Sequence, residues 1–146
     1  MNRYVSALMI GLMATAFSVA NQDTPERPGG DFGGQMMKCA KTCSECQLVC
    51  DACFKHCLSL TGETQKEHEK TAQLCADCAE CCKACATLCA RESLLSKHML
   101  ECCEKSCKQC ATACEKFEND RHMADCAKTC RDCEKECAEM LKKMGN

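Results

Sequence analysis

The sequence is poor in the large apolar side chains that fill most protein interiors. It has no tryptophan, one tyrosine and four phenylalanines in 146 residues, and its single isoleucine, Ile10, lies near the amino terminus. The few leucines and the one valine beyond residue 20 cannot fill the interior of a domain of this length. Small alanine and cysteine side chains must supply most of the packing, at well under the roughly 1.5–3 kcal/mol that each buried leucine contributes. We therefore expect a core of modest stability.

The sequence also lacks an excess of charge of one sign, a membrane-spanning run and a catalytic constellation. Its 19 basic and 21 acidic side chains give a net charge of −2, which argues against a nucleic-acid partner. The longest apolar run, from Val5 to Val19, has about 15 residues, whereas a span needs about 20. No cysteine is singled out beside a histidine and an acid, so we expect that the protein is not an enzyme.

The first 20 residues have the composition of a secretory signal. Arg3 precedes the apolar run, and Ser18, Val19 and Ala20 form a small-residue cleavage site, which predicts export to the periplasm and no membrane attachment after cleavage. A second arginine is missing, which argues against a twin-arginine signal. The predicted organisation is a signal peptide at 1–20, a flexible leader rich in proline and glycine at 21–35, and a helical bundle at 36–146.

Cysteine is the residue that the chain has in excess, with 21 copies. Nineteen of them follow an alternating spacing of three and four residues, which is the spacing of the inward-facing stripe of a helix. The four stripes are Cys39, Cys43, Cys46, Cys50, Cys53 and Cys57; Cys75, Cys78, Cys82, Cys85 and Cys89; Cys103, Cys107, Cys110 and Cys114; and Cys126, Cys130, Cys133 and Cys137. Sulfur therefore replaces the usual leucine and isoleucine core.

These stripes predict an all-α fold, an antiparallel up-down-up-down four-helix bundle with a cysteine-lined core. The predicted helices run from about Gln35 to Leu60, from Thr64 to Arg91, from Leu94 to Phe117, and from just after Asn119 or Asp120 to Met144. Thr64, Ser93 and Asp120 are candidate N-caps, because their side chains can accept hydrogen bonds from the first free backbone N–H groups. Gly62 and Gly145 are placed to end helices, because glycine readily adopts the left-handed conformation.

Several readings of the sulfur core compete. A disulfide scaffold fits an exported, cysteine-rich chain, but the number of thiols is odd and a link between residues four apart in one helix closes almost no loop. An iron–sulfur cluster is suggested by the spacing of Cys75, Cys78, Cys81 and Cys85, although this match lies within a continuous helical pattern. A zinc or cadmium thiolate buffer also remains open.

Storage of many Cu(I) ions is the reading that geometry and charge favour. Thiolates select Cu(I), and cysteines at positions i and i+4 lie on one helix face, so that two sulfurs can hold one ion. One Cu(I) ion cancels the charge of one thiolate, whereas a row of four-cysteine zinc sites would accumulate negative charge inside the protein. Nine such pairs can form at once, and Cys81 is a competing partner for Cys85. Ligand supply predicts a capacity on the order of 10 to 20 ions.

Over nearly the whole chain beyond residue 35, the four C-x3-C-x2-C-x3-C helices resemble those of the four-helix-bundle copper storage proteins. The resemblance implies that many Cu(I) ions are bound along the bundle axis by the 19 stripe cysteines. It also implies a homotetramer and, for exported members, the supply of copper to enzymes or chaperones that need it.

The two ends of the bundle carry other soft or nitrogen ligands. Met36, Met140 and Met144 extend the stripes at one end, and neutral thioethers that bind Cu(I) weakly suit an entry site. The alternative is that these methionines simply plug the end of the bundle. His68 and Met123 are in register with the cysteines at the opposite end, where His68 is a candidate ligand or a capping residue. Cys102 points away from the stripe, and the alternatives for it are a subunit contact or a surface site that it shares with His98.

Overall fold

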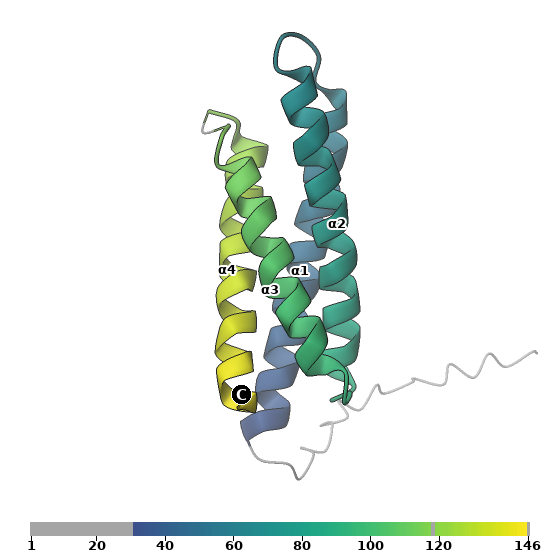
Figure 1. The fold of residues 1–146 in the computed structure, drawn as a ribbon, viewed down its shortest axis with the longest axis vertical. Helices are drawn as coiled ribbons and strands as arrows, with labels where there is room; N and C mark the ends of the chain where they lie inside the picture. Colours follow the sequence, from purple (N-terminus) through teal and green to yellow (C-terminus); the bar gives the residue numbers. More distant parts are fainter. Residues whose placement is uncertain (1–30, 118, 146) are drawn as a thin grey trace, which may run out of the picture.

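The computed structural model describes residues 31–117 and 119–145, and these form four α-helices with no β-strand among them. The helices are α1 (Asp31–Ser59), α2 (Gln65–Ala90), α3 (Ser96–Cys114) and α4 (Arg121–Met144). They run alternately up and down as an elongated bundle, with α1 beginning beside the end of α4 (Figure 1). The sequence-based prediction of an all-α antiparallel bundle is therefore confirmed, and the predicted signal peptide at 1–20 lies outside the described residues.

Each helix packs against two neighbours, so that α1 contacts α2 and α4, and α3 contacts the same two helices. The diagonal pairs are joined only through the core, which consists of 19 buried cysteines together with a few alanines, Leu100 and the methionines Met36, Met123 and Met140. The scarcity of large apolar residues in the sequence thus corresponds to an interior made mainly of sulfur. None of the described helices has both the length and the apolar character needed to cross a membrane.

Charged side chains lie on the outside and connect neighbouring helices. Arg131 on α4 donates two hydrogen bonds of 2.8 Å to the two carboxylate oxygens of Glu115, just beyond the end of α3. Lys38 on α1 pairs with Glu136 on α4. Such exposed pairs contribute little stability each, and they mainly fix which helix faces meet.

Helix α1 begins at Asp31, four residues before the predicted start, so the segment at 31–35 is not part of a flexible leader. The prediction assumed that Gly33 and Gly34 cannot hold a helix, since each glycine costs about 1 kcal/mol relative to alanine. Gly33, however, lies against the connection between α2 and α3, where a Cβ atom at this position would be only 3.2 Å from the side chain of Glu92. The propensity of single residues is only a weak guide to helix boundaries, and α1 continues through both glycines despite it.

The predicted helix ends agree with the structure to within a few residues. Asp120 caps α4, because its side chain accepts hydrogen bonds from the backbone N–H groups of His122 and Met123. Thr64 precedes α2 but makes no capping hydrogen bond through its side chain. Ser93 is not the N-cap of α3, which begins only at Ser96, although its hydroxyl accepts a hydrogen bond from the backbone N–H of Leu95.

Candidate metal centre

The interior of the bundle is a continuous column of thiols. All 19 stripe cysteines are buried, with exposed fractions of 2% or less. All 21 cysteines, each within the described part of the chain, are free thiols, which is not the arrangement of a disulfide scaffold. The spacing of three and four residues therefore placed every stripe cysteine correctly in the core.

Thiols from different helices approach each other as closely as thiols within one helix. The i,i+4 pair Cys46 and Cys50 has a Sγ–Sγ distance of 3.9 Å. Across helices, Cys50 on α1 lies 3.5 Å from Cys130 on α4. Cys46 on α1 lies 3.9 Å from Cys107 on the diagonal helix α3. The pairs within helices that the sequence suggested are therefore only part of the arrangement, since the short cysteine side chains also meet across the axis.

These contacts assemble groups of four buried thiols whose sulfur atoms all lie within 4.8 Å of one another. The groups include Cys43, Cys103, Cys133 and Cys137; Cys46, Cys78, Cys82 and Cys107; Cys46, Cys50, Cys78 and Cys130; Cys50, Cys110, Cys126 and Cys130; and Cys53, Cys75, Cys114 and Cys126. Apart from the group that contains Cys43, each of these groups shares at least one member with the next, so that metal ions in adjacent groups would have to share thiolates. The arrangement suits a chain of ions joined by bridging sulfurs better than a row of separate four-ligand sites.

Hydrogen bonds between thiols separate those that ionise readily from those that do not. Hydrogen bonds with neighbouring thiols, that with Cys103 the strongest, hold the pKa of Cys133 well below its usual value. The same network, again led by Cys103, raises the pKa of Cys43, and burial adds to this effect. Because an ionised thiol suppresses the ionisation of its neighbours, the metal-free core keeps many of its protons. A cation that binds in this core has to displace them.

The end of the bundle where α1 begins and α4 ends gathers methionines. Met36 and Met140 are buried, with exposed fractions of 1% and 2%. Met144 and Met99 are partly buried and pack against the sulfur core, while Met37 is exposed. The three methionines predicted to extend the stripes are thus placed at this end, and a role for them as copper ligands remains a proposal.

The opposite end holds His68 and a thioether that the sequence-based ligand set left out. The sulfur of Met123 accepts hydrogen bonds from the thiols of Cys53, at 3.4 Å, and Cys57, at 3.6 Å. Met123 therefore continues the sulfur column to the end of the bundle. The cysteine spacing already places Met123 in register with the stripe of its own helix, although it was not among the predicted ligands.

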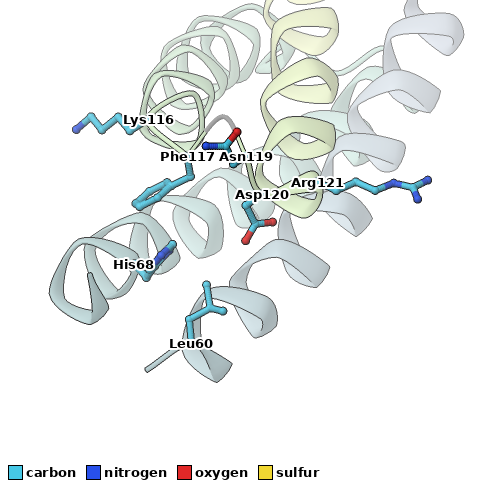
Figure 2. Close-up of a pocket in the computed structure, with 7 residues that line it drawn as sticks. All are labelled: Leu60, His68, Lys116, Phe117, Asn119, Asp120 and Arg121. Atoms are coloured by element: carbon cyan, nitrogen blue, oxygen red, sulfur yellow. The ribbon is translucent and has the colours of Figure 1, made fainter. Parts of the chain in front are cut away.

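His68 is buried beside a surface hollow of about 590 Å³ at this end. Its ring stacks on Phe117 at a centroid distance of 4.1 Å, and its Nδ1 atom has no hydrogen-bond partner within the described chain. Figure 2 shows His68 and Asp120 facing the hollow, whereas Lys116 and Arg121 point away from it. Asp120 is paired with Nε2 of His56 at 2.6 Å. The hollow thus leads to a buried imidazole with one free nitrogen.

Cys81 and Cys102 are the two cysteines outside the column. Cys81 is half-buried on α2 and Cys102 is exposed on α3, and their Sγ atoms are 3.5 Å apart. The sequence suggested Cys85 as a partner for Cys81, but in the structure Cys81 points outward toward Cys102. The sequence signal for this pair was weak, because it depends on how α2 packs on α3.

Comparison with known proteins identifies the class to which this bundle belongs. The family model of the copper storage proteins matches residues 33–142. This match covers most of the chain, and the chain therefore belongs to the copper storage protein family, as the resemblance in its cysteine pattern indicated. No curated protein matches the chain.

Two solved structures of a relative from Streptomyces lividans are similar to the whole bundle. One is a cytosolic copper storage protein with five coppers, with 30% identity and a TM-score of 0.72 over 78% of this chain and 98% of that one. The other is the copper storage protein Ccsp loaded with 10 copper equivalents, with 30% identity and a TM-score of 0.72 over 82% of this chain and 93% of that one.

The prediction of export to the periplasm is wrong according to this comparison, because the similar protein with five coppers is described as cytosolic. The apolar residues that suggested export lie outside the described residues.

Proposed function

We propose that this protein stores many Cu(I) ions as thiolate complexes along the axis of its bundle, without catalysing a reaction. The observation that carries the proposal is the overlap of the buried four-thiol groups, in which Cys46, Cys50 and Cys130 each belong to two groups. Shared thiolates can bridge successive Cu(I) ions. Members of the family and the similar solved structures bind several coppers, which supports the choice of metal.

Charge favours Cu(I) over zinc or cadmium in this interior. Four thiolates around a divalent ion leave a charge of −2, and several such sites in one buried column would repel each other at a high desolvation cost. A Cu(I) ion for each thiolate leaves the column neutral. A zinc or cadmium buffer is therefore the second candidate, and it predicts far fewer bound ions.

The two ends of the bundle are proposed as places where ions enter or leave. The thioethers of Met36, Met140 and Met144 bind Cu(I) without the charge of a thiolate, so ions held there can pass inward. Their position at the end of the sulfur column supports this role. His68 is proposed as a ligand at the other end, and its free Nδ1 atom beside the hollow supports this assignment.

The oligomeric state and the destination of the stored copper are also part of the proposal. A homotetramer is implied by the resemblance to the family, and the exposed leucines Leu48, Leu58, Leu94 and Leu95 are apolar surface that an interface would cover. Transfer of stored copper to copper-requiring enzymes or chaperones is the role that a supply function needs, and binding without onward transfer would serve detoxification.

The proposal is tested by titrating the reduced full chain with Cu(I) under anaerobic conditions in competition with a chromophoric chelator. We expect saturation at about 10 to 20 equivalents, set by the supply of thiolate ligands. A parallel titration with Zn(II) is the control and should saturate at about five equivalents or fewer, because each zinc ion needs about four ligands. Saturation with Cu(I) below about five equivalents contradicts storage.

A further inference from the structure

The thiols of Cys81 and Cys102 form a pair on the side of the bundle, outside the sulfur column. Their Sγ atoms are 3.5 Å apart, which is as close as the closest pairs of the core. Cys102 is exposed and Cys81 is half-buried, whereas the other 19 thiols of the described chain are buried. A thiolate on another molecule can therefore approach this pair but cannot approach the thiols of the column.

The exposed pair lies directly outside a pair of core thiols. Cys81 immediately precedes Cys82 on α2, and Cys102 immediately precedes Cys103 on α3. The Sγ atoms of Cys82 and Cys103 are 3.6 Å apart, and Cys82 is also 3.6 Å from Cys107. On each of the two adjacent helices, the surface thiol is thus one residue away from a core thiol that belongs to a four-thiol group.

Two facing thiolates are a sufficient ligand set for one soft monovalent cation. The pair is also better placed than a single cysteine, because it holds the ion from two helices that pack against each other along their length. His98 lies on the same face of α3, one helical turn before Cys102, and is exposed. It offers an imidazole within the same region of surface.

We propose that Cys81 and Cys102 form an acceptor site for Cu(I) on the side of the bundle, which takes the ion from a thiolate donor and passes it to Cys82 and Cys103. This inference rests on the proposed storage function. It adds a lateral route for loading that does not pass through the methionine or histidine ends.

The transfer is an exchange of ligands without a change of oxidation state. The donor holds Cu(I) by two thiolates, and the copper–sulfur bonds to the donor break as bonds to Cys81 and Cys102 form. The two protons lost by Cys81 and Cys102 go to the two thiolates of the donor, which leave as thiols. The second transfer follows the same scheme, with the protons of Cys82 and Cys103 returning to Cys81 and Cys102.

The test compares two double variants of the full chain that each lose two thiols from α2 and α3. One is Cys81→Ser with Cys102→Ser. The matched control is Cys75→Ser with Cys110→Ser, a core pair with a Sγ–Sγ distance of 3.6 Å that lies away from Cys82 and Cys103. Cu(I) is supplied anaerobically as its dithiothreitol complex, and both the initial rate of uptake and the final number of bound ions are measured. Circular dichroism verifies that each variant keeps its helices.

We expect the surface variant to take up copper several-fold more slowly than the wild type while its capacity falls by about one ion. The core variant should lose capacity without a slower initial rate. Alkylating the exposed thiols of the wild-type protein with iodoacetamide should reproduce the slower uptake without a mutation.

A surface variant that fills at the wild-type rate overturns the acceptor site and leaves storage intact. The same conclusion follows if the core variant is slowed as much as the surface variant. A wild-type chain that binds only a few ions overturns both the storage function and the acceptor site.

Discussion

At the scale of single residues, the cysteine side chains of this protein lie in two different chemical environments. A thiol inside the column is surrounded by other thiols, as Cys43 is by Cys133 at 3.7 Å and Cys137 at 3.8 Å. A thiol outside it, such as Cys102, is open to solvent. Since nucleophilic attack needs both access and a thiolate, burial protects the column from the alkylating and oxidising agents to which a cysteine-rich chain is otherwise exposed.

This difference predicts the order in which the thiols react. In the reduced, metal-free protein, iodoacetamide should modify Cys102 first and Cys81 second, because burial and the neighbouring thiol of Cys102 raise the pKa of Cys81 to about 11. The other thiols should react only after unfolding. Peptide mapping by mass spectrometry at successive times measures the order. Early modification of Cys46 or Cys130 would show that the column is open to solvent.

Individual residues also show what sequence patterns can and cannot predict. The three-and-four spacing identified all 19 cysteines of the column, because a helical period fixes which side chains share a face. It could not identify the partner of Cys81, because the contact with Cys102 depends on the packing between α2 and α3. The assignment of these residues as metal ligands stays a prediction until metal is seen on them.

At the scale of the helices, the ends are fixed by different means. The start of α4 has a capping side chain in Asp120, whereas the starts of α2 and α3 have no capping hydrogen bond from the side chain of the N-cap residue. Asp120 also joins two helices, because it pairs with His56 near the end of α1. Asp120 therefore stabilises the first turn of α4 and also holds this turn against α1.

We predict that Asp120→Ala destabilises the metal-free protein by about 1 kcal/mol, because the first N–H groups of α4 lose their acceptor. Asp120→Asn should be milder, since asparagine caps as well as aspartate does. The control is Asp125→Ala, which removes only an exposed pair with Arg121 at 3.8 Å and should change stability little. Urea unfolding followed by circular dichroism measures the three variants. Equal losses in Asp120→Ala and Asp125→Ala would contradict the capping role.

The carboxylate of Asp120 should also make the stability of the protein depend on pH. Burial opposes its ionisation, but hydrogen bonds from His56 and from the backbone of Met123 and His122 outweigh this effect and lower its pKa below 3.8. A lowered pKa in the folded state means that the contribution to stability is present above 3.8 and is lost as the pH falls through the folded-state value. Asp120→Asn should lack this part of the acid-induced loss.

Helix boundaries also show where sequence reasoning reaches its limit. Gly145 was identified from its residue type, and the start of α4 was narrowed to Asn119 or Asp120, of which Asp120 is the cap. The start of α1 was placed too late, because the glycines at its beginning were judged by propensity alone. The contact of Gly33 with the connection that contains Glu92 is a long-range contact, and no local pattern shows it.

At the scale of the whole molecule, four helices surround a core that consists mainly of thiol side chains. The bundle gives up the large apolar side chains that normally stabilise such a core, and it places overlapping groups of thiols there instead. Copper that binds only the folded protein should recover stability by mass action. The composition thus sacrifices core stability for capacity, and membership in the copper storage protein family agrees with this account.

The position of copper in the loaded protein tests this account most directly. Crystals of the reduced full chain loaded anaerobically with Cu(I) are measured by anomalous diffraction at the copper absorption edge. We predict a row of peaks along the bundle axis, each within bonding distance of column thiols such as those of Cys46, Cys107 and Cys130. Peaks confined to the outer surface of the helices, or a column without copper, would contradict it.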